Sequence, residues 1–479
     1  MQRHRAVVAV RNVGLMVMGL LGLACTAPNP RSCADGSCGD PALPFCDVDG
    51  ALGGTPDTCI AVACTPSEHA ACRDDVDVRC NADGTNYDLV QCSLGCSDAV
   101  DGCVTCQTNA ECTEAAPICD QDDHQCRGCT ADAECESKVC DVDVGRCFAQ
   151  SEVLYASATG PGTAPCTQLA PCSLPQAFML ALSNGLRSTV RLAPGRYVQE
   201  LAIASGSVTL VGEVGVVLAG DANKSATVMI GRGGTLTMRD LDIDLSTKAF
   251  LCGGFGTSGP YLLGGDLTMT RVKVSSSPSR ALYLYDCIAT MRRVSFTVDQ
   301  ANIAMTSNAG TTVDADQLVI TSTGASPARV HLYDRTRITN SVFSNAFLYL
   351  RGTGDQVNIA FNTFVVAQTA ISFDYEGDYA IENNVIVSTS GNVAVNCSTC
   401  PNLNHNILYP TAVTAPGTTN LMVDPQLVDP LTRNYHLKPT SPAVNAAMPS
   451  AGLSTDHDHD GTPRPQGPAL DIGAFELTP

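Results

Sequence analysis

The sequence predicts an all-β protein, a parallel β-helix preceded by a small disulfide-rich region. Two observations predict it. From about residue 236 a short apolar pattern returns about every 21 to 24 residues, with one longer step, and periods of this length mark stacked repeats. The stretch 33–147 differs in composition, because it holds 18 of the 25 cysteines and 23 acidic against 5 basic residues. It therefore carries most of the formal net charge of −20, and a boundary near residue 150 separates two kinds of chain.

The first residues are expected to be a targeting segment. Three arginines precede the apolar run 13–24, and this run is too short to span a bilayer of about 30 Å. We therefore predict a signal peptide over 1–24. The LGLAC sequence that ends at Cys25 resembles a bacterial lipobox, although Gly22 stands where a leucine is usual. The resemblance implies lipidation of Cys25 and a tether over 25–32, with ordinary cleavage and release of a soluble protein as the alternative.

Residues 33–150 are expected to form acidic repeats held by disulfides. Two similar units, 106–126 and 129–147, follow almost directly on one another. Exported thiols oxidise, and units this short need cross-links because they bury too little core. Two alternatives stay open: the Cys-Asp-x-Asp turns suit Ca²⁺, and four cysteines have the spacing of a zinc ribbon. Those four are Cys103, Cys106, Cys126 and Cys129. The connectivity of the disulfides is not predictable from the spacing.

The body of the chain is expected to be a stack of short strands. Val, Ile, Thr and Phe alternate with polar residues over short runs that are broken by Gly, Ser, Asn and Asp, which is typical of strands. One coil of about 22 residues leaves no room for a helix, and each coil buries its inner face by stacking on its neighbours. The first inward positions of successive coils are Met238, Met269, Met291, Ala315, Ile338, Ile359, Ile381 and Leu403.

Both ends of this body resemble those of a known superfamily. The segments 153–165 and 174–182 (LPQAFMLAL) are similar to the N-terminal cap, and 435–447 and 456–476 (ending DIGAFE) to the closing segment, of pectate-lyase-like proteins. The resemblance implies a single-stranded right-handed parallel β-helix with an N-terminal helical cap. It places the cap and first coil in 151–206, the β-helix in 207–412 and the C-terminal closing segment in 413–479. It is specific for fold and weak for function, because this fold carries many functions.

Several polar residues of the body are expected to be structural. Asn362, Asn384 and Asn406 recur at equal intervals, one coil apart, at one inward position. We therefore predict a ladder of stacked amides that hydrogen-bond along the coil axis. The remaining cysteines suggest local staples. The expected pairs are Cys166 with Cys172, Cys397 with Cys400, and Cys252 with Cys287.

Enzymes of this superfamily place clustered aspartates in a groove on the outer face of the coil, either on Ca²⁺ or as an acid and base pair. In this sequence neither of two outward columns, the one that begins at Asp242 and the one that begins at Arg239, holds neighbouring carboxylates. The nearest catalytic candidates are Asp240, Asp242, Asp244 and Arg271. A basic strip for an anionic polymer is a further hypothesis, made of Arg239, Arg271, Arg292 and Arg293. The candidate metal ligands Asp456, Asp458 and Asp460 match the opening of an EF-hand loop, but Gly467 stands where that loop needs Glu; a structural turn is the alternative.

We therefore expect a surface-anchored lipoprotein whose body binds an extended polymer, polysaccharide first, or serves as a structural or adhesive rod. A polysaccharide lyase or glycoside hydrolase is the alternative. The chain has no tryptophan, which leaves Tyr283, Tyr285 and Tyr333 as candidates for stacking on sugars. No cofactor is required, with Ca²⁺ left open. An acidic chain repels nucleic acid, so we expect no nucleic-acid partner. We expect an exported monomer, either at the outer membrane or cell surface or free outside the cell. Its contact with the membrane would be made by the lipid anchor.

Overall fold

The structure, a computed structural model, describes most of the chain in two compact units. The described residues are 33, 38–52, 54–62, 64–183, 185, 187–253, 264–276, 282–299, 303–333, 335–352, 356–373, 379–390, 394–396, 403–410, 419–449 and 456–478. One unit comprises the described residues up to Cys129 with Asp143–Arg146, and the other comprises Thr130–Val142 with the residues from Cys147 onward. The predicted signal peptide, the tether, Cys397 and Cys400 lie outside the described residues. Within them no helix is long and apolar enough to cross a membrane.

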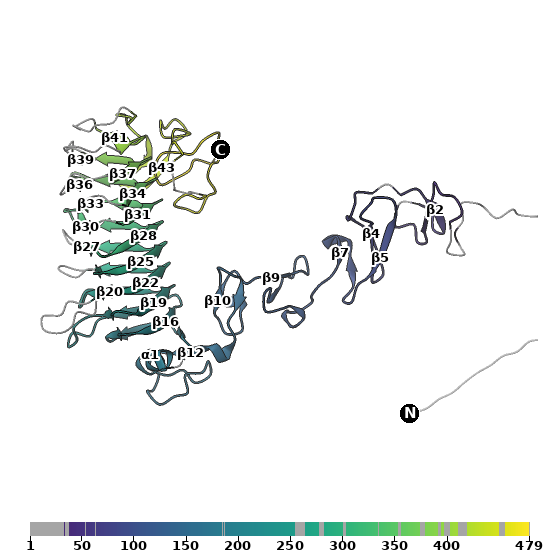
Figure 1. The fold of residues 1–479 in the computed structure, drawn as a ribbon, viewed down its shortest axis with the longest axis horizontal. Helices are drawn as coiled ribbons and strands as arrows, with labels where there is room; N and C mark the ends of the chain where they lie inside the picture. The colour runs from purple at the N-terminus through teal and green to yellow at the C-terminus, as the bar shows by residue number, and fades with distance from the viewer. Residues whose placement is uncertain are drawn as a thin grey trace, which may run out of the picture. The chain divides into compact units, whose positions relative to one another are not determined.

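The second unit is a parallel β-helix, as predicted, with three sheets that each receive one strand per coil (Figure 1). The first sheet contains β12 (Val153–Ala156), β13 (Thr189–Leu192), β16 (Gly206–Val211), β19 (Gly234–Arg239), β22 (Gly265–Thr270), β25 (Cys287–Arg292), β28 (Thr312–Asp316), β31 (Thr336–Thr339), β34 (Val357–Ala360), β37 (Tyr379–Glu382) and β40 (Leu403–Asn404). The second contains β14 (Gly195–Val198), β17 (Val216–Ala219), β20 (Asp242–Leu245), β23 (Lys273–Ser276), β26 (Ser295–Val298), β29 (Val319–Ser322), β32 (Val342–Ser344), β35 (Thr363–Val366), β38 (Val385–Ser388) and β41 (Ile407–Tyr409). The third contains β15 (Leu201–Ile203), β18 (Val228–Ile230), β21 (Phe250–Cys252), β24 (Leu282–Leu284), β27 (Ile303–Ser307), β30 (Ala328–Leu332), β33 (Ala346–Leu350), β36 (Ile371–Phe373) and β39 (Val395–Asn396).

The register of the first sheet confirms the repeat that the sequence predicts. The eight inward residues from Met238 to Leu403 are direct partners on successive strands, and all are at most 1% exposed. At the N-terminal end, α1 (Leu174–Ser183) adds Leu174, Ala177 and Phe178 to the same core. This helix is the predicted cap, and it covers apolar groups of the first coil that have no preceding coil to pack on.

From β19 onward, a tight two-residue bend joins the first sheet to the second sheet in each coil. Its first residue has a left-handed backbone, with φ between 48° and 59° at eight positions. These positions are Asp240, Arg271, Arg293, Gln317, Asn340, Phe361, Asn383 and His405. Asparagine and aspartate tolerate this conformation, whereas bulky residues adopt it at a steric cost. The stacked coils on both sides therefore impose the bend, and local sequence preference does not.

The next residue of the bend points inward and carries the asparagine ladder. Nδ2 of Asn362 donates to Oδ1 of Asn384 at 3.0 Å, and Nδ2 of Asn384 donates to Oδ1 of Asn406 at 2.9 Å. The ladder continues to Asn420, whose Oδ1 accepts from Nδ2 of Asn406 at 3.1 Å. Each of the first three amides is fully buried and also donates to backbone carbonyls, as Asn384 does to Ile359. The ladder satisfies the polar groups that this position buries.

The C-terminal segment contains β42 (Leu427–Asp429), η5 (Pro430–Thr432) and β43 (Asn434–Leu437). It covers the outer face of the second sheet at its last strands. There Val385 and Ile407 lie in one apolar cluster with Ile472, Ala474 and Phe475. The DIGAFE sequence is therefore a packing element that closes one side of the coil.

The first unit consists of short strands and turns cross-linked by disulfides. Its elements are β1 (Phe45–Asp47), β2 (Thr58–Ile60), β3 (His69–Arg73), β4 (Val76–Cys80), β5 (Tyr87–Gln91), β6 (Cys96–Ser97), η1 (Asp98–Val100), β7 (Gly102–Cys103), η2 (Asn109–Glu111), β8 (Ile118–Cys119) and β9 (Cys126–Arg127). Farther along the chain lie η3 (Asp132–Glu134), β10 (Cys140–Asp141), β11 (Arg146–Cys147) and η4 (Gln150–Glu152). Within the repeat 106–126 the first cysteine pairs with the third and the second with the fourth.

Candidate functional site

The acidic catalytic candidates are paired with arginines. Asp240 lies at the bend after β19, where Nε of Arg271 is 2.5 Å from Oδ1 and Nη1 of Arg239 is 3.0 Å from Oδ2. Burial disfavours the charged carboxylate, but the arginines outweigh it and hold the pKa of Asp240 below its usual value. Asp244 is paired with Arg196 at 2.5 Å. Both oxygens of Asp240 accept from arginines, and an acid, base or metal-binding role would have to displace these partners.

Asp242 lies on β20 beside Lys273 of β23, its direct partner in the register. No second carboxylate stands next to it in that outward column, which continues with Ser295, Val319 and Val342. General acid and base catalysis on sugars needs two carboxylates a few ångströms apart. The described part of this column does not provide them.

The arginines of the predicted basic strip all have hydrogen-bond partners. Arg239 donates to Asp132 at 2.7 Å as well as to Asp240, and Arg292 donates to Asp314 at 2.6 Å. Nε of Arg293 donates to the side-chain oxygen of Gln317 at 3.0 Å. A polyanion that bound to this strip would have to compete with these partners.

The DHDHDG sequence forms a turn in the closing segment. Asp458 is 1% exposed and accepts from the backbone N–H groups of Asp460, Thr462 and Glu476. Oδ1 of Asp456 lies 2.6 Å from Nδ1 of His457. Oδ2 of Asp460 lies 2.7 Å from Nε2 of His436. The three aspartates therefore serve different partners, and the structural alternative describes this segment better than a cation site does.

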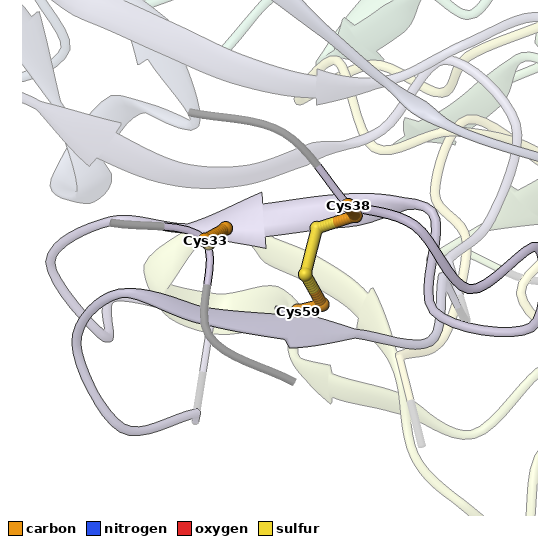
Figure 2. Close-up of side chains that lie close together, drawn as sticks. All are labelled: Cys33, Cys38 and Cys59. Atoms are coloured by element: carbon orange, nitrogen blue, oxygen red, sulfur yellow. A yellow bond between two sulfur atoms is a disulfide. The ribbon is translucent and has the colours of Figure 1, made fainter. Parts of the chain in front are cut away.

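The cysteines of the described residues are all in disulfides. Figure 2 shows one of the sulfur clusters, in which Cys38 is bonded to Cys59 and Cys33 lies beside them; the bond of Cys33 is to Cys46. Because Zn²⁺ binds thiolates, disulfides exclude the zinc ribbon alternative. Cys103 and Cys106 pair with Cys92 and Cys119 instead. In the body, Cys166 is bonded to Cys172 and Cys252 to Cys287.

The Cys-Asp-x-Asp turns also use their carboxylates internally. Asp47 is fully buried, accepts from Arg73 at 2.9 Å and caps the N–H of Gly54. Asp120 accepts from Arg127 at 2.8 Å. Both aspartates have an arginine as a counter-ion, and Asp47 also has the hydrogen bond of a turn.

An aromatic strip lies on the outer face of the third sheet. We define it by four tyrosines, one histidine and one arginine contributed by β24, β30, β33 and the residues that follow them: Tyr283, Tyr285, His331, Tyr333, Tyr349 and Arg351. The register places Tyr283, Thr306, His331 and Tyr349 in one column across successive strands. The sequence singled out the first two tyrosines and Tyr333; it missed Tyr349, His331 and Arg351.

The members of the aromatic strip contact one another. The rings of Tyr283 and Tyr285 are stacked with centroids 6.3 Å apart. Those of His331 and Tyr349 meet edge to face at 5.2 Å. The Arg351 guanidinium lies 5.5 Å from the ring centroids of both Tyr333 and Tyr349. Burial raises the pKa of Tyr285, and the neighbouring phenols Tyr283 and Tyr333 add to this rise. All six side chains remain partly exposed, so their outer surfaces face solvent.

A groove of about 570 Å³ lies on the outer face of the second sheet at its C-terminal end. Its floor is formed by Val365, Val387 and Tyr409, which are direct partners on β35, β38 and β41. Its wall is the segment from Asp424 to Leu431, and Lys438 of the closing segment also contributes. No pattern in the sequence indicates this groove, because its wall, which contains β42 and the start of η5, lies outside the repeat of the coil.

Comparison with known proteins adds little to this description. No protein family matches the chain, and no curated protein matches it in sequence. Among solved structures, the crystal structure of pectate lyase Pel9A is similar, with a TM-score of 0.34 and 13% sequence identity. The similarity covers 69% of this chain and 97% of that one. A likeness this distant carries no argument about function, and the parallel β-helix rests on the strand order described above.

Proposed function

We propose that this chain is a surface-anchored lipoprotein whose β-helix body binds an extended polysaccharide along the aromatic strip. The strip is the observation that carries the proposal. A tyrosine presents an apolar ring face that stacks on the C–H face of a sugar, together with a hydroxyl that hydrogen-bonds to the sugar's rim. Tyrosine side chains have few rotatable bonds, so little conformational entropy is lost when they bind a ligand.

The arrangement of the strip suits a chain more than a single sugar. Adjacent strands lie about 4.8 Å apart, so the four strands from β24 to β33 span about 14 Å along the coil axis. Arg351 over the rings of Tyr333 and Tyr349 holds these two side chains in place. A polymer that runs along the coil axis would meet aromatic rings on the coils of β24, β30 and β33, with Thr306 of β27 between the first two.

The alternative is a polysaccharide lyase or glycoside hydrolase. Such an enzyme needs carboxylates, or carboxylates and an arginine, that converge on the bound sugar. None of the nine strands of the third sheet contains Asp or Glu. Among the described residues, the aromatic strip is therefore built for stacking, and we place binding ahead of catalysis.

Affinity electrophoresis against a panel of neutral and acidic polysaccharides tests the proposal. We expect at least one polysaccharide to retard the wild-type chain. The variants Tyr283→Ala and Tyr349→Ala should each lose at least tenfold in affinity. Thr237→Ala, on the outer face of the first sheet, is the control and should bind normally. Unchanged binding in both tyrosine variants would remove the strip from the proposal. Release of unsaturated products or new reducing ends from any polysaccharide would establish the enzyme instead.

The anchor is tested separately. The lipobox-like ending at Cys25 supports lipidation, and the disulfides support export, because they persist outside the cytoplasm. In the producing bacterium the wild-type chain should partition with membranes and into detergent. Cys25→Ser should appear in the aqueous phase with the same disulfides. A Cys25→Ser chain that still partitions with membranes contradicts lipidation.

A further inference from the structure

The groove on the second sheet is a second cavity, separate from the aromatic strip. The strip lies on the third sheet, and the two share no residue. The volume of the groove, about 570 Å³, falls in the range of about 300–1,000 Å³ that is usual for small-molecule sites.

The groove keeps apolar groups exposed beside a part of this face that the closing segment covers. Deeper on the same outer face, Val385 and Ile407 are fully buried under the closing segment. At the groove, Tyr409 is 36% exposed, Val428 42% and Leu431 95%. Prolines 410, 425 and 430 add further flat apolar surface. The closing segment thus leaves Tyr409 on the floor and Val428 and Leu431 on the wall exposed, whereas Val365 at the base of the groove is only 6% exposed.

Polar groups surround this floor. Asp429 uses Oδ1 to cap η5, and Asp424 uses Oδ1 to accept from the N–H of Gln426. The second oxygen of each carboxylate has no partner among the described residues. Lys438 is exposed, and among the described residues it forms no ion pair. Thr389 also reaches the groove.

We infer that this groove binds a short neutral oligosaccharide. An apolar floor with one aromatic ring, next to carboxylate oxygens that accept and an ammonium that donates, matches a sugar, whose C–H faces are apolar and whose rim carries hydroxyls. Two carboxylates against one cation disfavour an anionic ligand. An extended apolar peptide would leave Asp424, Asp429 and Lys438 without hydrogen-bonding partners from its own side chains, so the sugar is the better complement. The inference does not depend on the aromatic strip.

Calorimetric titration of the full chain with cellotriose, xylotriose, mannotriose and maltotriose tests it. We expect at least one trisaccharide to bind. Tyr409→Ala should weaken that binding at least tenfold, and so should Asp424→Asn combined with Lys438→Ala. Thr237→Ala, on the outer face of the first sheet and outside both sites, is the control and should bind the trisaccharide as the wild type does. Tyr409→Ala should keep the affinity of the aromatic strip for polysaccharide, so failure of the strip and failure of the groove are distinguishable.

Three outcomes would overturn the inference. One is that no trisaccharide binds the wild-type chain. Another is that binding survives in Tyr409→Ala, which keeps the fold because its side chain is partly exposed. The third is that an apolar peptide, in place of every sugar tested, binds in a manner that depends on Tyr409. Circular dichroism of each variant confirms that the β-helix is intact.

Discussion

Nη1 of Arg464 lies 2.9 Å from Oε2 of Glu476, and both side chains are at most 1% exposed. The guanidinium also donates to the backbone carbonyls of Asp471 and Gly473 and lies 5.2 Å from the ring centroid of Phe361, at a bend of the coil. Burial lowers the pKa of Arg464 and raises that of Glu476, so each charge depends on the other. This buried pair explains the DIGAFE sequence as a brace between the closing segment and the coil.

Removing one member of the pair is predicted to destabilise the β-helix strongly. Glu476→Ala leaves a buried guanidinium without its counter-ion, which costs about 3–5 kcal/mol of unfolding free energy. Urea unfolding monitored by circular dichroism measures it. The double variant Arg464→Met with Glu476→Leu should lose less than the single variant, because neither member of the pair stays buried without the other.

The matched control is an ion pair at the surface. Arg196 is half exposed and pairs with Asp244. Arg196→Ala should change the unfolding free energy by only about 0–1 kcal/mol, since solvent screens this pair. If both single variants cost the same, the brace has no special role.

The asparagine ladder is predicted to contribute to the unfolding free energy of the β-helix. Asn384→Ala leaves the carbonyl of Ile359 and the amide of Asn362 without a buried partner, and each such group costs about 1–3 kcal/mol. We expect a loss of at least about 2 kcal/mol by urea unfolding. Asn396→Ala, exposed on β39, should stay within about 0.5 kcal/mol of the wild type. Equal effects at the two positions would mean that the ladder contributes nothing.

The contact between His457 and β28 is predicted to depend on pH. Burial lowers the pKa of His457, but the hydrogen bonds and charges of Asp316 and Asp456 outweigh it, and the pKa is raised above 6.5. The folded chain therefore binds the proton more tightly than the unfolded chain. The resulting stability is fully present below about pH 6.5 and is lost as the pH rises through the folded pKa.

Thermal melts at several pH values check this prediction. The melting temperature of the wild type should fall, relative to that of His457→Gln, between pH 6 and pH 8. A constant difference between the two proteins across this interval would show that His457 does not change its protonation there.

Reduction of the disulfides is predicted to unfold the first unit and to leave the β-helix folded. The first unit has little core beyond its disulfides, and loss of a native disulfide costs a small domain about 2–5 kcal/mol. The body has a continuous apolar core, with Cys166–Cys172 and Cys252–Cys287 as its disulfides among the described residues after residue 150. After treatment with a reductant, trypsin should leave a resistant fragment that begins near residue 150. A first unit that resists trypsin when reduced would contradict this account.

Several features of this protein follow from its sequence alone. Repeated inward residues such as Met269 and Met291 predict the coil, because apolar side chains at a fixed period are buried only by stacking. The same regular spacing predicts the ladder through Asn362, Asn384 and Asn406. Asn420 follows Asn406 after a much shorter step, so the period misses it.

Other features are decided only in the folded chain. The left-handed bend at Arg271 and Phe361 has no local signal, because the neighbouring coils impose it. The pairing of Asp240 with Arg271, on the next coil, neutralises a cluster that looks catalytic in the sequence. The disulfide partners are also decided only in the folded chain, since spacing alone permits many pairings.

The aromatic strip shows the same division. The sequence supplies its tyrosines, but the connections into the third sheet vary in length, so counting does not show that Tyr283 and Tyr349 share one column. Tertiary stacking brings them together, and it also leaves the groove at Tyr409 open. Periodic burial can be predicted from the sequence because it acts through near neighbours, whereas surface sites depend on distances that only the folded coil defines.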